Sequence, residues 1–368
     1  MIYHFFKGNS YHLSYDMIEN VLSCADDTNK GGRDEHFFVV YGDGKVECED
    51  DYRDLFQKYH HTQYLICNLR DELLKKCISY GKKKDSSIVL HGSLNPYRIQ
   101  ALVYLILLLV GGLKRTSLIC WGEGDYSLTD FFKKRSWILR VTLYWIFRKM
   151  RYVATLSQGD VDKCKKIYGN LQNIVLARYY GKDDIESLRK REKKDESYNF
   201  LVSHSGWVHN CHLESFALLS KFKDENITIT CPLCYGDNEN IKTVIEKGNE
   251  IFGEKFHYFT ELLTTNEYLK LIGAMDFYVS GARIQTGLFA ASRSLVKGCK
   301  VFVRDNLYES LQQFGYTVYN YDDLKTITYD QLIQPLGNDI IENNIKAFMN
   351  MRNYEDSIKI WKKIYATN

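Results

Sequence analysis

The stretch NFLVSHSG, residues 199–206, is an apolar run that ends in a polar segment containing a glycine. Four other segments of this kind follow apolar runs, at His91–Pro96, Trp121–Asp125, Tyr235–Asp237 and Ser280–Arg283. Ligands of open α/β sheets bind beyond the carboxyl ends of the strands, so residues that follow strands can build a binding site there. The recurring pattern therefore predicts an α/β protein whose site is assembled from strand ends.

Strand-like runs alternate with helical patterns in both halves of the chain, which predicts parallel, doubly wound sheets. In the first half we expect strands at 36–41, 87–90, 117–121, 152–156 and 173–176. In the second half we expect them at 199–203, 227–230, 256–259, 277–279, 301–303 and 317–319. Two such halves predict two sheets whose carboxyl ends face a common cleft.

The length of 368 residues suits two domains rather than one. We expect an N-terminal domain over 1–182, a charged linker over 183–197 and a second domain over 198–350. The linker is predicted from a run of charged residues with almost no apolar periodicity. The last segment, 351–368, reads as a helix that can pack back on the N-terminal domain.

Composition and missing motifs exclude several classes of protein. The formal net charge is only +3, and there is no basic-aromatic strand motif or zinc-finger spacing, so nucleic acid is not an expected partner. Neither GxGxxG nor GxxxxGK[ST] occurs, which argues against an ordinary dinucleotide dehydrogenase and a P-loop ATPase. The 10 Cys form no framework. The single CxxC, Cys231 to Cys234, favours buried free thiols over a zinc or redox site, and we expect no metal.

No signal peptide is expected at the N-terminus, where a basic region followed by a long apolar run is missing. The most apolar run, Ala101–Val110, is shorter than the roughly 20 residues of a membrane-spanning helix. We therefore expect a buried core helix there. It would begin after Asn95 as N-cap and Pro96 as first helical residue, and it would end at Gly111-Gly112.

The second half carries the expected phosphate-binding residues. After residue 203 the chain offers His204, Ser205, Gly206, His209 and Asn210 just before a helix, where backbone N–H groups bind anions. A plain turn with Asn210 as helix cap is the alternative. Arg283 precedes a second helix that Gly287 opens, and arginine presents paired N–H groups to phosphate. A surface ion pair is the alternative for Arg283. The remaining candidates for donor binding are Tyr235, Gly236, Gln285 and Thr286.

The first half carries candidates for binding or activating a hydroxyl compound. Glu123 and Asp125 lie beside an aromatic residue, and either carboxylate suits a general base, although both can simply be solvated. His91 can bind a ligand or can be a satisfied histidine at a strand end. The other candidates on this side are Gly92, Asn95 and Trp121.

The stretch 131–153 is both aromatic and basic. A helix of this kind can lie on an anionic bilayer surface, and a core helix with a solvated basic edge is the alternative. The residues of this expected membrane face are Lys133, Lys134, Arg140, Trp145, Arg148 and Arg151.

These segments together resemble the bacterial 4-acetamido-4,6-dideoxygalactose (Fuc4NAc) transferases, in the same order along roughly residues 85–305. The similar positions are His91-Gly92, Asn95-Pro96, Gly111–Lys114, Trp121-Gly122, Ala154-Thr155, Gly159-Asp160, Ser205-Gly206, Asn210, His212, Pro232, Tyr235, Arg283, Gln285, Gly287 and Gly298. The resemblance implies a GT-B glycosyltransferase with two Rossmann-like domains, no obligatory metal and no cofactor beyond the nucleotide-sugar, the acceptor lying on the first domain and the donor on the second.

The resemblance also implies a reaction. Fuc4NAc would pass from a dTDP-sugar to a polyprenyl-diphosphate-linked saccharide, in enterobacterial common antigen or O-antigen synthesis. The enzyme would be cytoplasmic and peripheral on the inner face of the bacterial inner membrane. Arg283 would stabilise the departing nucleotide diphosphate, and Glu123 or Asp125 would act on the acceptor.

The chain departs from the family pattern at three places, one of which is a gap that is needed between Arg283 and Gly298. Its Trp121-Gly122-Glu123-Gly124-Asp125 has one residue more than the family's Trp-Gly-Ala-Asp, so the family's acid matches Asp125 only with a gap. Arg293 lies about where many retaining GT-B enzymes carry a ribose-binding Glu. Two other functions stay open: a GT-B-fold nucleotide-sugar epimerase and a non-catalytic nucleotide-sugar-binding subunit.

Overall fold

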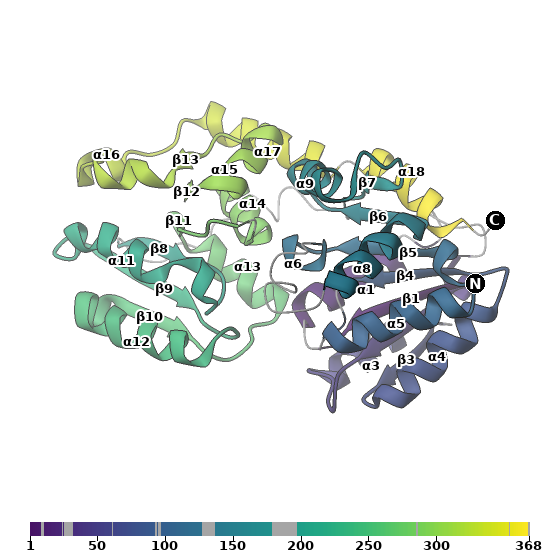
Figure 1. Ribbon diagram of the computed structural model, residues 1–368. Helices are drawn as coiled ribbons and strands as arrows, with labels where there is room; N and C mark the ends of the chain where they lie inside the picture. Colours follow the sequence, from purple (N-terminus) through teal and green to yellow (C-terminus); the bar gives the residue numbers. More distant parts are fainter. Residues whose placement is uncertain are drawn as a thin grey trace. The chain divides into compact units, whose positions relative to one another are not determined.

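The computed structural model describes residues 1–8, 11–23, 25, 32–60, 62–92, 94, 97–126, 137–178, 197–284, 286–352 and 354–366. The chain divides into two compact units (Figure 1). Unit 1 comprises Met1–Lys182 together with Arg352–Asn368, and unit 2 comprises Asp183–Met351. Most of the charged stretch expected as a linker, 183–196, lies outside the described residues.

Unit 1 is built on a seven-stranded sheet in the order β3-β2-β1-β4-β5-β6-β7, with every neighbouring pair parallel. The strand order reverses between β1 and β4, which makes their carboxyl ends a topological switch point. The strands are β1 (Ile2–Lys7), β2 (His36–Tyr41), β3 (Gln63–Cys67), β4 (Ser87–His91), β5 (Thr116–Cys120), β6 (Tyr152–Thr155) and β7 (Ile174–Leu176).

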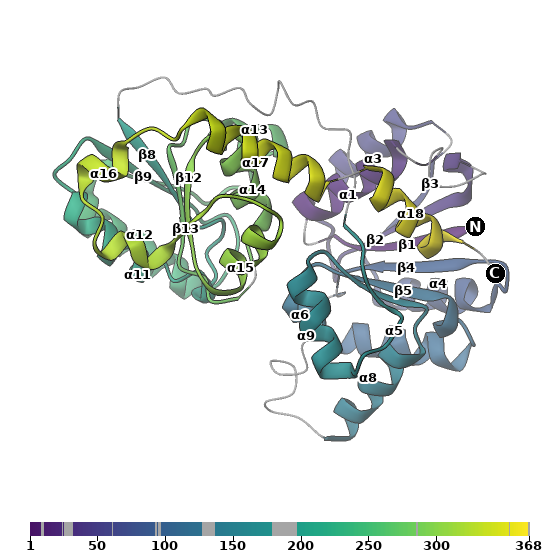
Figure 2. The same ribbon diagram turned by 90° about the horizontal axis from the view of Figure 1, so that it is seen from above.

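Helices cover both faces of this sheet, because its strands are apolar on both sides. One face packs against α4 (Arg70–Lys82), α5 (Tyr97–Leu109), α8 (Trp137–Lys149) and α9 (Gln158–Tyr168). The other packs against α1 (Tyr11–Ser23), α3 (Glu49–Lys58) and the C-terminal α18 (Tyr354–Tyr365), as Figure 2 shows. Trp361 of α18 is buried, and its Nε1 donates to the carbonyl of Arg178 at 2.9 Å. The end of the chain is thus part of the core of unit 1.

Unit 2 repeats the plan with a six-stranded parallel sheet in the order β10-β9-β8-β11-β12-β13. Its switch point lies between β8 and β11. The strands are β8 (Tyr198–Val202), β9 (Ile227–Pro232), β10 (Phe256–Phe259), β11 (Phe277–Ser280), β12 (Lys300–Val303) and β13 (Tyr319–Asn320). One face packs against α11 (His212–Leu219), α12 (Asn238–Phe252) and α16 (Tyr329–Ile333). The other packs against α13 (Thr265–Gly273), α14 (Leu288–Val296), α15 (Asp305–Gln313) and α17 (Asn338–Met351).

The prediction of parallel, doubly wound α/β sheets is confirmed. Each expected strand is present within a few residues, whereas β1 and β3 were not predicted. The expected stop after α5 is also present: Gly111 has φ +75°, and the N–H of Gly112 donates to the carbonyl of Leu107 at 2.8 Å. At α9 the hydroxyl of Ser157, the N-cap, accepts from the N–H of Asp160.

One prediction about the most apolar helix is wrong. The sequence indicated a buried core helix at 101–110, but Leu102, Leu105 and Leu109 of α5 are exposed. An amphipathic sequence would place polar residues on that face, and this helix has none to place there between Ala101 and Val110. No helix in the described ranges combines the length and the apolarity that crossing a bilayer needs.

Candidate functional site

The switch point of unit 2 brings two strand-end loops together. The loop after β8 starts at Ser203, whose φ of 61° is left-handed, and the N–H of Ser203 donates to the carbonyl of Val279 in β11 at 2.8 Å. The loop after β11 leads through Arg283 and Thr286 to α14. The residues expected from sequence at 203–210 and 280–287 are therefore neighbours in space, apart from Gln285, which lies outside the described residues.

His204 joins these two loops. Its Nε2 lies 3.0 Å from the hydroxyl oxygen of Thr286. Its Nδ1 is buried without a hydrogen-bond partner among the described residues. Gly287, the N-cap of α14, has φ +73°, and a Cβ there would lie 2.8 Å from Nδ1 of His204 and 2.6 Å from the hydroxyl of Tyr278. Only glycine lets both polar groups approach the start of this helix so closely.

The His204 ring is neutral at physiological pH. Burial, together with the smaller effects of the neighbouring His209 and His212, lowers its pKa from 6.5 to about 3. A neutral imidazole carries one N–H donor and one acceptor nitrogen. Since Nε2 is taken by Thr286, Nδ1 is the group that His204 can offer to a ligand.

Ser205 and Asn210 bind each other. The side-chain amide of Asn210 donates to the carbonyl of Ser205 at 2.6 Å and to its hydroxyl at 2.8 Å, and both residues are buried. The N-cap of α11 is Cys211 rather than Asn210, so the alternative of Asn210 as a helix cap is wrong. These two residues hold the turn that positions His204 and the half-buried His209.

The glycines of the next two segments are explained by close packing. The N–H of Gly206 donates to the carbonyl of Tyr235 at 2.7 Å, and Gly206 and Gly236 form a parallel bridge. A Cβ on Gly236 would lie 2.3 Å from the backbone of Gly206. These glycines therefore let the loops after β8 and β9 touch. The sequence suggested that glycine here serves phosphate binding, and it did not indicate this packing role. The Tyr235 ring is exposed beside them.

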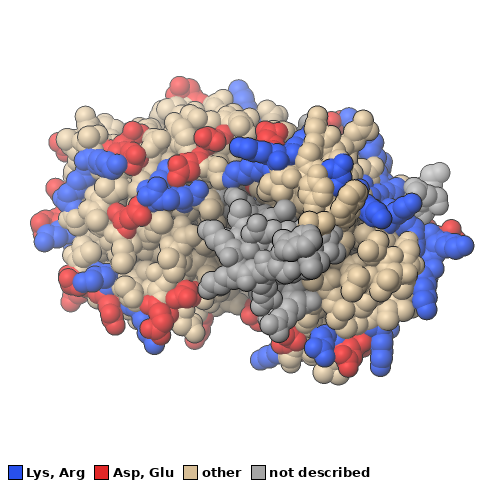
Figure 3. Space-filling model, viewed as in Figure 1, with Lys and Arg blue, Asp and Glu red and all other residues tan. Residues whose placement is uncertain are grey.

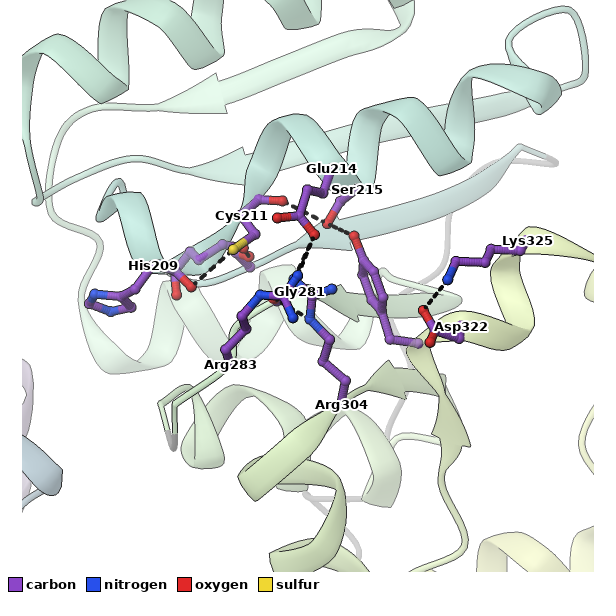
Figure 4. Close-up of polar contacts among 12 residues, drawn as sticks. His209, Cys211, Glu214, Ser215, Gly281, Arg283, Arg304, Asp322 and Lys325 are labelled. Atoms are coloured by element: carbon purple, nitrogen blue, oxygen red, sulfur yellow. Dashed lines mark hydrogen bonds and ion pairs between the residues drawn. The ribbon is translucent and has the colours of Figure 1, made fainter.

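A cluster of two arginines and one carboxylate lies at the same end of the sheet. Figure 4 shows the guanidinium groups of Arg283 and Arg304 converging on Glu214, in the first turn of α11. The N···O distances are 2.8 Å from Arg304 and 3.5 Å from Arg283. The hydrogen bond from Arg304 holds the pKa of Glu214 below its ordinary value. One carboxylate against two guanidinium groups leaves this cluster positive.

The two arginines differ in how firmly they are held. Arg304 is only 11% exposed, donates to the carbonyl of Gly281 at 2.7 Å and lies 4.6 Å above the Tyr321 ring, whose hydroxyl is 3.0 Å from that of Ser215. Arg283 is 64% exposed. The surface ion pair considered for Arg283 does exist, but such a pair is weak in solvent. Arg283 can therefore leave Glu214 for an anionic ligand.

Sequence reasoning missed Arg304 and Glu214. Arg304 follows a strand in the same way as Arg283, and that position was the available signal. Nothing in the sequence marked Glu214 as a site residue, because Glu is common in the first turn of a helix.

In unit 1, His91 is a core residue. It is buried, its Nε2 lies 3.0 Å from Nδ1 of His4, and Nε2 of His4 lies 2.8 Å from Nδ1 of His36. Its ring stacks on Phe6 at 4.0 Å, and burial lowers its pKa to about 3. These contacts match the alternative of a histidine whose hydrogen bonds are satisfied at a strand end. Because the His91 side chain is fully buried, an acceptor has no exposed atom of it to bind.

The loops after β4 and β5 pack on each other. Gly92 has φ +71°, and a Cβ there would lie 2.8 Å from the Trp121 ring. The N–H of Trp121 donates to a carboxylate oxygen of Asp125 at 2.5 Å, so Asp125 holds the turn before the short helix α6 (Glu123–Tyr126). Asn95 and the side chain of Glu123 lie outside the described residues.

The described residues of the expected membrane face differ in exposure and in hydrogen bonding. Lys133, Lys134 and the side chain of Arg140 lie outside the described residues, whereas Trp145 is exposed. Arg148 donates to the Tyr144 hydroxyl at 2.7 Å and to the carbonyl of Tyr168 at 3.0 Å. Arg151 donates to the carbonyl of Ala366 and to the hydroxyl of Ser87. Arg148 thus ties α8 to α9, and Arg151, which follows α8, ties the start of β6 to β4 and to the residue after α18.

The two cysteines of the CxxC segment are free thiols, Cys231 buried and Cys234 half-buried. Burial raises the pKa of both. A thiol whose pKa is raised is a poor nucleophile and a poor metal ligand. This is the buried-thiol interpretation. Among the described residues, no group of three or more His, Cys, Asp or Glu side chains is placed to hold a metal ion.

Comparison with known proteins adds the following. The sequence profile described as 4-alpha-L-fucosyltransferase glycosyl transferase group 56 matches residues 26–308. No curated protein sequence matches the chain. Among solved structures, sucrose-phosphate synthase from Thermosynechococcus elongatus is similar with a TM-score of 0.68 and 10% identity, covering 98% of this chain and 96% of that one.

Two further structures are similar over nearly their whole length. A glycosyltransferase from Rickettsia africae has a TM-score of 0.66 and 13% identity, covering 99% of this chain and 98% of its own. Anabaena HepE, solved in complex with UDP and glucose, has a TM-score of 0.62 and 12% identity, covering 98% and 96%. At these identities the likeness shows the fold, which is GT-B, as expected.

Proposed function

The chain belongs to the 4-alpha-L-fucosyltransferase glycosyl transferase group 56 family, and on that premise we propose the sugar and the acceptor that it uses. It is a glycosyltransferase with a nucleotide-sugar donor. We propose that it moves a Fuc4NAc-like deoxy-aminosugar from a dTDP-sugar to a polyprenyl-diphosphate-linked saccharide. The family description names fucosyl transfer, and a 6-deoxy sugar of this kind is consistent with it.

The observation that carries the donor half of the proposal is the arginine cluster, whose Arg283 lies in the same loop as Thr286, the partner of His204. Arg283 and Arg304 share one carboxylate at the carboxyl ends of β11 and β12, where ligands of parallel sheets bind. A nucleotide diphosphate is a dianion or more highly charged, and guanidinium groups bind its oxygens in pairs. Arg283 would leave Glu214 and bind the diphosphate, while Nδ1 of His204 and the Gly287 end of α14 complete the site.

Catalysis would follow from the same groups. Negative charge develops on the diphosphate as the bond to the sugar breaks, and preorganised positive groups stabilise it. Arginine and a helix N-terminus supply that charge without a divalent ion, so we propose a metal-independent reaction. An acceptor hydroxyl would lose its proton to Glu123 or Asp125. Asp125 already accepts from a backbone N–H, which fixes its orientation.

The acceptor and the location are part of the proposal. A polyprenyl-diphosphate-linked saccharide belongs to enterobacterial common antigen or O-antigen synthesis, and its lipid would keep the enzyme peripheral on the inner face of the bacterial inner membrane. Two rivals are weighed against this. A GT-B-fold epimerase would convert the donor with no acceptor present, and a binding subunit would hold the donor without consuming it.

Nucleotide binding is the first test. Thermal unfolding would be measured with dTDP, UDP, GDP and ADP, because a ligand that binds only the native state stabilises it, by about 2.7 kcal/mol at 100 times Kd. We expect dTDP to raise the melting temperature most. No response to any of the four nucleotides would contradict the proposal.

Arg283→Ala tests the role of the arginine. We expect kcat/KM for the donor to fall by about 100-fold to 1,000-fold, as removal of one group that stabilises developing charge does. Lys325→Ala, which removes an exposed cation from the same unit, is the matched control. Turnover by Arg283→Ala equal to that of the control, at limiting and saturating donor, would exclude this assignment.

A further inference from the structure

Helix α5 exposes a row of leucines that a folded protein in water would normally cover. Leu102, Leu105, Leu108 and Leu109 are each between 37% and 75% exposed. Residues three and seven apart lie on one side of a helix, so Leu102, Leu105 and Leu109 form a continuous stripe. Contiguous exposed apolar surface of this kind marks a binding surface far more often than scattered apolar residues do.

The opposite side of α5 is packed normally. Val103, Tyr104 and Leu107 are buried against the sheet of unit 1, and the Tyr104 ring meets Phe147 of α8 edge-on at 5.8 Å. The helix is therefore apolar on all sides but buried on only one. A helix with this pattern is stable where its second apolar side is also removed from water.

Helix α8 extends the exposed apolar surface. Both helices pack on the same face of the sheet, so their outer sides point the same way (Figure 2). On α8, Trp145 is 56% exposed and Val141 is 46% exposed. We call these two residues and the four leucines of α5 the leucine face. Figure 3 shows an uncharged surface in the region of α5, bordered mainly by Lys and Arg and at its lower edge also by Asp or Glu.

The segments that carry the leucine face contain charges of one sign only. No Asp or Glu occurs between residues 86 and 122 or between residues 131 and 159, although the whole chain carries 46 acids against 49 basic residues. Lys82, Lys114 and Lys149 are exposed at the ends of α4, α5 and α8. The segments that carry the exposed leucines thus hold cations and no acids, whereas the neighbouring α4 has Asp71 and Glu72 in its first turn.

We infer that the leucine face binds to an anionic bilayer surface. Leucine and tryptophan side chains would enter the boundary between headgroups and acyl chains, and the surrounding lysines would lie at the anionic phosphates. The helix would lie in the interface rather than cross it. The inference rests on the proposed function, because an enzyme that uses a lipid-linked acceptor has to reach that acceptor at a bilayer.

Charge also decides between a bilayer and a second copy of the chain. A two-fold dimer places the same patch of both protomers face to face. Two leucine faces joined in this way would bring cations against cations, with no acid in the segments that carry them. Anionic lipid supplies the opposite charge that a second copy lacks.

Flotation with vesicles tests the inference. The vesicles would contain phosphatidylcholine alone, or phosphatidylcholine and phosphatidylglycerol in equal parts. We expect the protein to float with the anionic vesicles only. The double variant Leu105→Gln with Leu109→Gln should bind them about tenfold more weakly or worse, because it replaces two inserting side chains by polar ones. Glutamine suits an exposed helix, and circular dichroism would confirm folding.

Leu69→Gln is the matched control, because Leu69 is 67% exposed in unit 1 but lies at the N-cap of α4, outside the leucine face. It should float as the wild type does. Flotation of the double variant equal to that of the wild type would overturn the inference. So would size-exclusion chromatography showing a wild-type dimer and a monomeric double variant, which would assign the face to self-association. The nucleotide-induced thermal shift, measured on the same samples, reports separately on the proposed function.

Discussion

Both units carry buried histidines in or beside a parallel sheet, but the two groups are bonded differently. In unit 1, His4, His36 and His91 form a chain through ring nitrogens at 2.8 and 3.0 Å, under α18. In unit 2, Nδ1 of His204 and both ring nitrogens of His212 are buried without a hydrogen-bond partner among the described residues. Most ring nitrogens of the unit 1 histidines thus have hydrogen-bond partners, whereas those of unit 2 include three that have none among the described residues.

This difference indicates which histidines serve stability and which are available for ligands. A buried donor or acceptor without a partner costs about 1 to 3 kcal/mol. The histidines of unit 1 avoid most of that cost by bonding one another. Those of unit 2 do not. His204 joins the loops that follow β8 and β11, where a phosphate or sugar hydroxyl would supply its missing bond, whereas His212 is only 2% exposed. We therefore expect mutations in the two groups to change different properties.

Acid should give the largest effect, and it should come mainly from unit 1. Burial lowers the pKa of His36 and His91 from 6.5 to about 3, and that of His4 falls well below 6.5. Below pH 6.5 these histidines bind protons in the unfolded chain but stay neutral in the folded protein. Their contribution to stability is thus complete above pH 6.5 and is lost as the pH falls toward 3, by up to about 1.4 kcal/mol per pH unit for each histidine.

Urea unfolding at several pH values between 7.5 and 5 would measure this slope. His36→Gln should make it shallower, whereas His60→Gln, at an exposed position, should leave it unchanged. His204 and His212 act in the same direction, since burial lowers their pKa to about 3 and about 4. An unfolding free energy that stays constant from pH 7 to pH 5 would contradict the interpretation of the buried histidines.

His4→Ala tests whether the histidines of unit 1 serve stability rather than ligand binding. It removes two hydrogen bonds and a ring stacked on Phe38 at 4.9 Å, and it leaves a cavity in the sheet of unit 1. We expect a loss of about 3 to 5 kcal/mol in unfolding free energy. The folded protein should still bind the nucleotide, as titration calorimetry would show. His257→Ala, an exposed substitution on β10, should cost less than about 0.5 kcal/mol.

His204→Ala should do the reverse. We expect kcat/KM for the donor to fall by about 100-fold, which corresponds to about 2.7 kcal/mol of transition-state stabilisation, with little change in unfolding free energy. Thr286→Val, which removes the hydroxyl that orients Nε2, should have the same but smaller effect. Full activity of His204→Ala, together with a large loss of stability, would place this histidine with those of unit 1.

Glu214→Gln should give the smallest effect. Glu214 itself is 49% exposed, so the unfolding free energy should change by less than about 1 kcal/mol. Without the carboxylate, Arg283 has no partner to leave, and we expect the nucleotide diphosphate to bind a few times more tightly at low salt. Calorimetry at two salt concentrations would measure this. Weaker binding would mean that Glu214 positions the arginines for the ligand rather than competing with it.

The sequence predicted most of the fold because apolar runs and helical patterns are local signals. It missed β1, the central strand of unit 1, whose Tyr3, His4, Phe5 and Phe6 are buried on both sides and show no alternation. It missed β3, an edge strand that is mostly half-buried. Burial of a helix was also predicted from apolarity alone, and α5 shows that an apolar helix can keep one side in water.

The candidate site was predicted less completely, because its contacts are formed between distant segments. The sequence indicated Arg283, Gly287 and His204 from their places after strands. It did not indicate that Arg304 and Glu214 complete the cluster, or that Gly206 and Gly236 serve to let two backbones touch.

By itself, then, the sequence determined the order of strands and helices, the helix ends and the polar residues at the strand ends, since all of these depend on neighbouring residues. The tertiary structure alone decided which of those polar residues are satisfied. His91 and His204 both follow or end a strand, and nothing local distinguishes them. Only packing gives His91 the rings of His4 and Phe6 as partners and leaves Nδ1 of His204 without one among the described residues.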